Sequence, residues 1–532
     1  MKEIKMIPRD YQKAIFETAK NQNTLVVLPT GIGKTLIALM LSVHRLKQHP
    51  LKKILILAPT KPLIEQHMES FKKNLPELFA DLQLFTGSVP ASSRQKLWNS
   101  AEIVFSTPQC VANDLQNGLY DLKSVSLLVI DEAHRCLKNY DYNKIAQQYK
   151  QQAENQLILG LTASPGSEQI KVKQICKNLS VDEVEIRTRD SPDVKPYLQE
   201  LEFQKIEVPF PAEFQEIRIL LQTLYEKKVS QLRNRNILFG PSNKITLLKL
   251  QSRLASQVTP TSRGKNFQAM IGMSLTAQAI KISHAIELLE TQTLSGLKEY
   301  LIGLKKQAEQ KKSKGVQTLV NSPEFSLAFN LLENLISKQI EHPKIEELKT
   351  LIAEEFAEEE KAKIIIFSQF RETASTIAKN LNQLKKINAS VFVGQTKKIS
   401  TSNKTSGMSQ KEQKQIIEDF REGKINILCA TSIGEEGLDI PEVNAVYFYE
   451  PIPSAIRKIQ RAGRTARLMP GKLKIMVTKN TRDEIHHYAS SAREKKMHKI
   501  ISNVKADLKE ELKEELKNND LQKSSITLED FK

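Results

Sequence analysis

The chain has 532 residues, too many for one hydrophobic core, and its length suggests about three domains. Hydrophobic residues make up 40% of it, and no apolar run approaches the roughly 20 residues of a membrane-spanning helix, which argues against a membrane protein. The net charge of +18 fits a polyanionic partner such as nucleic acid, although a Lys-rich proteome with merely solubilising basic surfaces would show the same excess.

The first third of the chain alternates short apolar runs with amphipathic helical segments. Continuous apolar strands between helices are typical of a parallel sheet covered on both faces. Residues 1–196 are therefore predicted to form a doubly wound α/β domain. The predicted strands are TLVVLP at 24–29, KILILAP at 53–59, IVFSTP at 103–108, SLLVID at 126–131 and LILGLTA at 157–163.

Residues 197–343 have a different pattern. Strand-like runs nearly vanish, and apolar residues recur at helical spacing, which predicts a mostly helical insert. The spacing is clearest in Phe214, Ile217, Leu220, Leu221 and Leu224. Between 201 and 340 there are 19 Lys and Arg against 11 Asp and Glu, which fits either a solvated face or a nucleic-acid contact. The basic cluster comprises Arg233, Arg235, Lys244, Lys305, Lys306, Lys311, Lys312 and Lys314.

Residues 344–498 return to the alternation of strands and helices and predict a second doubly wound domain. Its predicted strands are KIIIFSQ at 363–369, SVFVGQ at 390–395, INILCAT at 425–431, AVYFYE at 445–450 and KLKIMVT at 472–478. Residues 499–532 form a polar tail, expected to be helical or disordered. A helical stripe in it is formed by Val504, Leu508, Leu512 and Leu516.

The four cysteines lie in no CxxC or Cys/His cluster, so we expect no zinc or iron–sulfur site. They should be small apolar residues in a reducing cytoplasm. The N-terminal sequence also lacks the apolar core of a signal peptide. The four are Cys110, Cys136, Cys176 and Cys429.

A phosphate-binding loop is predicted at PTGIGKT, residues 29–35, between an apolar strand and an apolar helical run. Its glycines let backbone N–H groups curl toward phosphates, and the next helix presents its positive end. Lys34 would neutralise the β- and γ-phosphates of ATP, and Thr35 would bind Mg²⁺. The stricter pattern has glycine at the place of Leu28, so an ordinary glycine turn is the alternative. The residues expected to contact the nucleotide are Leu28, Pro29, Thr30, Gly31, Ile32, Gly33, Lys34 and Thr35.

The sequence DEAH at 131–134 ends a predicted strand. Acidic residues at the carboxyl end of a strand lie where ligands bind in open α/β sheets. Asp131 suits Mg²⁺ binding through water, and Glu132 suits polarisation of the attacking water. Two exposed turn acids are the alternative, but a position about a hundred residues after a phosphate loop favours catalysis.

QRAGRTAR at 460–467 is the third catalytic segment. Gln460, Arg464 and Arg467 share one helical face, and Arg457 and Arg461 add to the crowding of positive charge. Such crowding is costly unless an anion neutralises it, and the planar arginine fork suits phosphate oxygens. The functional interpretation is an arginine finger that reaches the γ-phosphate from the second domain, and the alternative is a surface salt-bridge lattice. A nucleotide held between two such domains indicates a motor that closes and opens with each hydrolysis.

The order of these motifs resembles that of superfamily 2 helicases, which implies two RecA-like domains. RDYQ at 9–12 resembles the adenine-reading motif, with Arg9 and Gln12, and TAS at 162–164 resembles the coupling motif. ATSIGEEGLDIP at 430–441 resembles a motif of the second domain and implies nucleotide contacts by Gly437 and Asp439. The strand-gripping motifs mostly contact phosphates, so weak sequence preference is expected. They imply nucleic-acid contacts by Pro59, Thr60, Gly87, Thr107, Ser368, Gln369 and Thr431.

Finer details over residues 1–500 are similar to archaeal Hef helicases and to the Fanconi anaemia M-type translocases. They are SPDVKPY at 191–197, FVGQ at 392–395 and TRDE to REKKM at 481–497. This resemblance implies remodelling of forked and four-way DNA in fork repair and recombination, a thumb-like insert that contacts branched DNA, and a nucleoid-associated protein of the archaeal cytoplasm. Many Hef proteins also carry a nuclease, and because only a short tail follows Met497 we expect no nuclease activity from this chain.

The last residues, SITLEDFK at 525–532, resemble sliding-clamp binding peptides. Leu528 and Phe531 would be the anchors one helical turn apart. The alternative is a disordered end with incidental apolar residues.

Two other functions fit part of this pattern. An RNA motor of the RIG-I or Dicer type shares the core and a helical insert, and discrimination of the 2′-hydroxyl depends on geometry. A binding or scaffold protein with a decayed ATPase is the other, although the residues needed for hydrolysis are all present.

Overall fold

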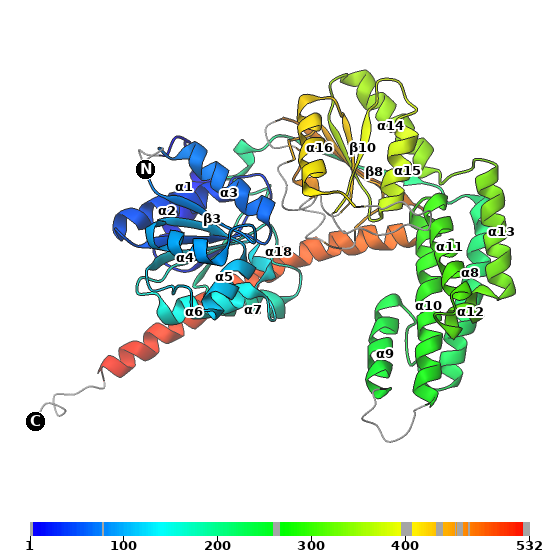
Figure 1. Ribbon diagram of the computed structural model, residues 1–532, viewed down its shortest axis with the longest axis horizontal. Helices are drawn as coiled ribbons and strands as arrows, with labels where there is room; N and C mark the ends of the chain where they lie inside the picture. The colour runs from blue at the N-terminus through cyan, green and yellow to red at the C-terminus, as the bar shows by residue number, and fades with distance from the viewer. Residues whose placement is uncertain are drawn as a thin grey trace, which may run out of the picture.

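The computed structural model describes residues 4–76, 79–258, 267–394, 407–431, 440–452, 454, 461–465 and 469–524. Two parallel sheets and a helical insert make up these residues (Figure 1). The body around the first sheet is called lobe 1, the body around the second sheet lobe 2, and the helices between 212 and 337 the insert. The predicted α/β fold class with two doubly wound domains and an insert is confirmed.

Lobe 1 is built on a seven-stranded sheet in the order β3-β4-β2-β5-β6-β1-β7, in which every pair is parallel. Neighbouring residues of the central strands enter separate core clusters, as Leu55 and Ile56 do, so helices cover both faces. The strands are β1 Thr24–Val27, β2 Lys53–Leu57, β3 Leu82–Phe85, β4 Ile103–Ser106, β5 Val125–Asp131, β6 Ile158–Thr162 and β7 Glu183–Ile186. The helices are α1 Asp10–Ala19, α2 Lys34–Gln48, α3 Lys61–Asn74, α4 Ala91–Ser100, α5 Pro108–Gln116, α6 Asp141–Gln152 and α7 Gln169–Leu179.

Lobe 2 is built on a six-stranded parallel sheet in the order β10-β11-β9-β12-β13-β8. The strands are β8 Leu201–Val208, β9 Ile364–Phe367, β10 Ala389–Phe392, β11 Ile427–Ala430, β12 Ala445–Phe448 and β13 Gly471–Thr478. The helices beside them are α14 Lys344–Glu358, α15 Arg371–Leu381 and α16 Gln410–Glu422.

Strand β8 corrects the sequence prediction, which placed residues 201–208 in the helical insert. It pairs with β13 over its whole length, from Leu201 opposite Gly471 to Val208 opposite Thr478. β8, like β3 and β7, is an edge strand with polar residues, and of the four edge strands only β10 was predicted, from the run SVFV. Edge strands are buried on fewer sides, so their sequences lack the continuous apolar run that marked the central strands.

In its described residues, 212–258 and 267–337, the insert has six helices whose apolar stripes meet in two cores. Four of the five predicted stripe residues of α8 are buried against α10, which confirms the helical spacing, and Leu220 is partly buried. All four cysteines are buried, as predicted. The insert helices are α8 Ala212–Asn234, α9 Lys244–Gln257, α10 Phe267–Thr291, α11 Leu294–Glu309, α12 Lys314–Val320 and α13 Pro323–Ser337. None of the helices in the described ranges is both long and apolar enough to cross a bilayer.

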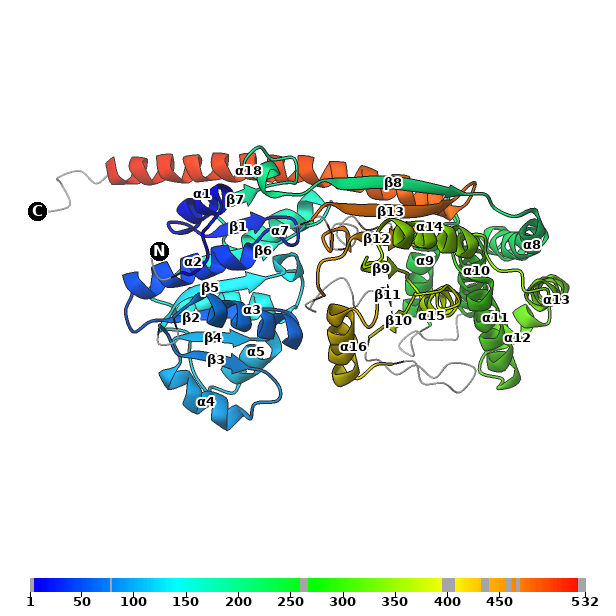
Figure 2. The same ribbon diagram turned by 90° about the horizontal axis from the view of Figure 1, so that it is seen from above.

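Helix α18, Arg482–Ser524, connects the two lobes. It starts beside β13 in lobe 2 and runs along lobe 1, where four of its apolar residues enter the core (Figure 2). Two ion pairs hold it there, Lys505 with Glu183 at 3.0 Å and Lys173 with Asp507 at 2.8 Å. Residues 499–524, predicted as a helical or disordered tail, thus continue α18, and the sequence prediction did not include its docking on lobe 1. The four core residues are Met497, Ile500, Ile501 and Val504.

Replacing Ile501 by alanine should destabilise the contact between α18 and lobe 1. Ile501 is fully buried, and removal of a buried isoleucine side chain leaves a cavity that typically costs about 2–5 kcal/mol. Ile485→Ala, on the exposed face of the same helix, is the matched control. Urea unfolding should begin earlier for Ile501→Ala alone, and equal midpoints for both variants would contradict the docking of α18.

Candidate functional site

The loop between β1 and α2 has the backbone shape that a phosphate cradle requires. Gly31 and Gly33 lie in the left-handed region, with φ of 87° and 84°, which other residues rarely adopt. At Gly33 an added Cβ atom would stand 2.3 Å from Nε2 of Gln12. The loop accepts no side chain there, and α2 begins at the next residue, Lys34, with its positive end toward the loop.

The environment of Leu28 explains why leucine is accepted where the stricter phosphate-loop pattern has glycine. Its side chain is fully buried, and its N–H donates to the carbonyl of Thr162 at 3.0 Å. The chain is therefore still extended and part of the core at this position, and it turns only afterwards. Ile32 is also buried, whereas Pro29, Thr30 and Thr35 are half-buried.

The predicted nucleotide-reading residues at 9–12 contact the loop itself. The amide Nε2 of Gln12 donates to the carbonyls of Gly33 at 3.2 Å and Ile32 at 3.4 Å. Tyr11, which the sequence prediction did not single out, donates its hydroxyl to the carbonyl of Ile32 at 2.6 Å. Arg9 lies over the ring of Tyr197 at 5.3 Å. The hydrogen bonds of Gln12 and Tyr11 thus hold the glycine loop against α1.

The acidic pair lies at the carboxyl end of β5. Oδ2 of Asp131 lies 2.8 Å from Nε2 of His67, and its Oδ1 accepts a hydrogen bond from the N–H of Glu132. Burial raises the pKa of Asp131, but the hydrogen bond and charge of His67 and the charge of Lys34 outweigh it and hold the pKa below its usual range. Asp131 is therefore a carboxylate, although it is buried. His67 was missed as a partner because α3, which carries it, is distant in sequence.

His134 connects the acidic pair to the predicted coupling motif. Its Nδ1 lies 3.2 Å from Oε2 of Glu132 and 3.1 Å from Oγ1 of Thr162. Thr162 accepts in turn from the N–H of Ser164, and the hydroxyl of Ser164 lies 2.7 Å from Sδ of Met497 on α18. A series of short contacts thus leads from the acidic pair to the helix that comes from lobe 2.

A cavity of about 270 Å³ lies where the lobes meet. Pro29 and Thr30 of the glycine loop line it from lobe 1, and Ala462 and Gly463 of the arginine segment line it from lobe 2. Met497 of α18 closes another part of its wall. The arginine segment therefore faces the glycine loop across one cavity.

Of the predicted catalytic residues in lobe 2, only Arg464 is placed. It is buried and directly follows the cavity-lining Gly463. Gln460, Arg467, Gly437 and Asp439 lie outside the described residues, as do both anchors of the predicted clamp peptide.

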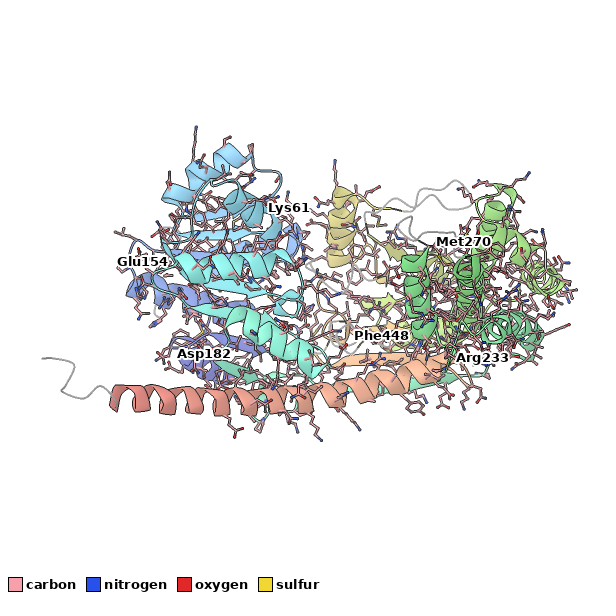
Figure 3. All side chains as sticks on the ribbon, turned by 90° about the horizontal axis from the view of Figure 1, so that it is seen from below. Lys61, Glu154, Asp182, Arg233, Met270 and Phe448 are labelled. Atoms are coloured by element: carbon pink, nitrogen blue, oxygen red, sulfur yellow. The ribbon has the colours of Figure 1, made fainter. Side chains whose placement is uncertain are left out.

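The residues of lobe 1 that are predicted to contact nucleic acid lie just after the ends of three adjacent strands, β3, β4 and β2. Thr60 and Thr107 immediately precede α3 and α5, so each lies at the positive end of a helix, where phosphates bind. Pro59 and the exposed Gly87 lie at the same edge. Lys61, the first residue of α3, lies on the side of lobe 1 that faces lobe 2 (Figure 3).

The corresponding residues of lobe 2 follow β9 and β11, which pair with each other. Ser368 and Thr431 are buried, and Gln369 is exposed. The structure therefore brings each lobe's residues together at the carboxyl edge of its sheet.

Three family models match the chain. The model for DEAD/DEAH box helicases matches residues 9–172, and the helicase conserved C-terminal domain matches residues 343–469. The model described as "Putative ATP-dependent RNA helicase, helical bundle" matches residues 213–339.

Solved and curated proteins resemble the chain over most of its length. The crystal structure of the Pyrococcus furiosus Hef helicase domain is 40% identical, covers 91% of this chain and 98% of that one, and has a TM-score of 0.67. A Methanocaldococcus jannaschii protein named "Putative ATP-dependent RNA helicase" is 35% identical over 93% of this chain, and the Neurospora crassa "ATP-dependent DNA helicase mph1" is 33% identical over 90%. The chain spans only 61% and 41% of these two curated relatives.

Gly33→Ala should weaken nucleotide binding by about tenfold or more, because the new Cβ would displace Gln12 and distort the loop. Gly118→Ala is the matched control. It has the same left-handed conformation, at φ 65°, but no atom within 4 Å of an added Cβ. Titration with a fluorescent nucleotide checks this, and equal affinities for the two variants would contradict the role of the loop.

Proposed function

Because the chain belongs to the Hef family of superfamily 2 helicases, we propose that it is an ATP-driven motor that remodels forked or branched DNA. The observation that carries the proposal is the cavity lined by the glycine loop of lobe 1 and the arginine segment of lobe 2. A site divided between two lobes couples nucleotide turnover to their relative movement. Lobes that each hold nucleic acid and move in this way would step along it.

The groups around the glycine loop fit a nucleoside triphosphate with Mg²⁺. Left-handed glycines and the start of α2 provide the backbone shape and the N–H groups that suit phosphates, and Lys34 adds a positive charge. We assign Thr35 and Asp131 to Mg²⁺, which would neutralise phosphate charge, and the lowered pKa of Asp131 suits this role. Glu132 would polarise the attacking water.

From lobe 2, Arg464 would stabilise the negative charge that develops on the γ-phosphate, as an arginine finger does. For Gln460 and Arg467 we propose a role in hydrolysis on the basis of the sequence motif alone. A side chain of lobe 2 would act on phosphates held by lobe 1 only when the lobes close, so hydrolysis would depend on closure.

Glu132→Gln should lower the rate of ATP hydrolysis about 100-fold or more while nucleic-acid binding persists, because the side chain keeps its size but loses its base. Glu154→Gln is the control, since Glu154 is an exposed acid on the side of lobe 1 away from Lys61 (Figure 3). Steady-state ATPase and fluorescence anisotropy measure the two properties. Full turnover by Glu132→Gln would exclude the assigned role.

DNA is proposed as the substrate because the fungal relative is named a DNA helicase. RNA is the second candidate, since the archaeal relative and the model for the insert are named for RNA helicases. ATPase and unwinding assays across forked, four-way and single-stranded DNA and duplex RNA separate them. Preferential stimulation by duplex RNA would favour the second candidate.

The insert supports the choice of a branched substrate. Arg233 and Arg235 at the end of α8 are exposed, and the carbonyl of Arg235 accepts a hydrogen bond from Gln268 near the start of α10. Phe239 and Phe267 are also exposed at this end. Basic groups beside exposed aromatic rings suit phosphates and unstacked bases together. Figure 3 shows Arg233 and Met270 on the insert, away from lobe 1.

Arg233→Glu with Arg235→Glu should weaken binding of forked DNA and lower the slope of log affinity against log salt by about 2, because two phosphate contacts are lost. Unstimulated ATPase should survive. Lys72→Glu with Lys73→Glu, an equal charge change at the far end of α3, is the control. If unstimulated ATPase also collapsed, the insert would have a structural role in place of a DNA contact.

We further propose that Leu528 and Phe531 bind a sliding clamp, and that the protein acts at the nucleoid. A clamp pull-down with Leu528→Ala and Phe531→Ala tests the first point, and an unchanged yield would remove it.

A further inference from the structure

His67 is a polar side chain in the apolar stripe by which α3 packs on the sheet of lobe 1. Its neighbours in this stripe, Ile64 and Phe71, belong to the hydrophobic core on that face. His67 itself is only 4% exposed. Burial of a polar side chain has a free-energy cost unless hydrogen bonds offset it. The partners of the imidazole therefore indicate what the residue does.

Among the residues that the structure describes, Asp131 is the hydrogen-bond partner of this imidazole. Nε2 of His67 lies 2.8 Å from Oδ2 of Asp131. An ionised carboxylate only accepts hydrogen bonds, so Nε2 carries the proton and donates it. The other ring nitrogen, Nδ1, is buried and has no hydrogen-bond partner within the described ranges. The one hydrogen bond of the ring thus goes to the carboxylate that we assign to Mg²⁺.

Asp131 is held from three directions. Its Oδ1 accepts a hydrogen bond from the N–H of Glu132 at 2.9 Å, and its backbone carbonyl accepts one from the hydroxyl of Tyr142 at 2.8 Å. The first comes from the next residue of the chain, and the second reaches the backbone alone. His67 is therefore the described donor that connects the side chain of Asp131 to another helix, and the position of α3 sets where this donor stands.

The same helix begins at the predicted nucleic-acid edge. Thr60 is its N-cap, and its first residue, Lys61, lies on the side of lobe 1 that faces lobe 2 (Figure 3). Thr60 and His67 are seven residues apart, so they lie two turns apart on one helical face, about 10 Å along the axis. A displacement of the start of α3 is carried to His67 because the two turns between them are hydrogen-bonded as one helix.

We propose that His67 is a positioning residue that aligns the Asp131 carboxylate for Mg²⁺ and ties this alignment to nucleic acid seated at the start of α3. The proposal rests on the proposed function. Carboxylates that bind metal ions are oriented by hydrogen bonds from their neighbours, and loss of such a neighbour typically costs about 10–100-fold in metal affinity or activity. His67 gives α3 this hold on the acidic pair.

His67→Gln and His67→Asn test the position of the donor. The amide nitrogen of glutamine reaches about as far as Nε2 of histidine, whereas that of asparagine reaches only as far as Nδ1. Both variants keep a polar side chain, but only glutamine can donate to Asp131. With forked DNA, kcat for ATP should fall about tenfold or more in His67→Asn and stay within about threefold in His67→Gln. DNA affinity without nucleotide should stay within about twofold in both, because the start of α3 is unchanged.

Nucleotide binding provides a readout that does not depend on turnover. The affinity for a fluorescent non-hydrolysable ATP analogue is measured with Mg²⁺ and with EDTA, and the ratio of the two affinities is the gain from Mg²⁺. This gain should be about tenfold smaller in His67→Asn than in the wild type, with equal affinities in EDTA. Forked DNA should raise the gain about fivefold or more in the wild type, and about twofold or less in His67→Asn.

His44→Asn is the matched control. His44 lies on α2 of the same lobe, is half-buried, and packs its ring edge-on against Phe16 at 5.6 Å. This variant should keep kcat and the gain from Mg²⁺. His67→Leu is a further variant that removes the donor and continues the apolar stripe, and it should behave as His67→Asn does. All assays are run below the thermal midpoints of the variants.

Three results would overturn the proposal. They are a His67→Asn variant that matches His67→Gln in kcat and in the gain from Mg²⁺, a loss of nucleotide affinity that is as large in EDTA as in Mg²⁺, and a wild-type gain that forked DNA leaves unchanged. The second result would show a purely structural role of His67. A wild type without turnover on any nucleic acid would instead overturn the proposed function.

Discussion

In both sheets the described strands pair in parallel, and this pairing decides where the predicted functional residues that directly follow these strands lie. Parallel neighbours end at the same edge, so loops that are far apart in sequence come together there. The glycine loop after β1, the acidic pair after β5 and the coupling motif after β6 occupy one stretch of the edge of lobe 1. A strand running the other way would carry its loop to the opposite edge and divide the site.

The lobes are further constrained by α18, which begins in lobe 2 and packs apolar residues of its middle part into the core of lobe 1. A helix is stiff along its axis, so its apolar residues transmit the position of one lobe to the other. The contact between Met497 and Ser164 places that helix directly against the coupling motif. Lobe 2 thus contacts the region of the glycine loop in two places. One is the wall of the cavity, and the other is α18.

Burial of apolar side chains stabilises the fold, whereas burial of charged side chains has a free-energy cost that their partners must offset. Removal of the Lys344–Asp483 pair from water has a large desolvation cost, and apolar residues of similar size often stabilise a protein as well or better. Lys344 and Asp483 lie where lobe 2, the insert and α18 meet. We therefore infer that the pair aligns these three parts as well as contributing to stability. Asp131 shows the same principle in lobe 1, where His67 and Lys34 keep a buried carboxyl ionised.

The sequence by itself determined the central strands, both α/β domains, the helical insert and the glycine loop, because continuous apolar runs and glycine spacing are local signals. It did not reveal three of the four edge strands, β3, β7 and β8, whose polar residues carry no such signal, or the docking of α18, whose partner surface is more than 300 residues away. The roles of His67 and Tyr11 emerged only from the tertiary structure. Their importance comes from what folding places beside them, and contacts across long sequence separations leave no periodicity to detect.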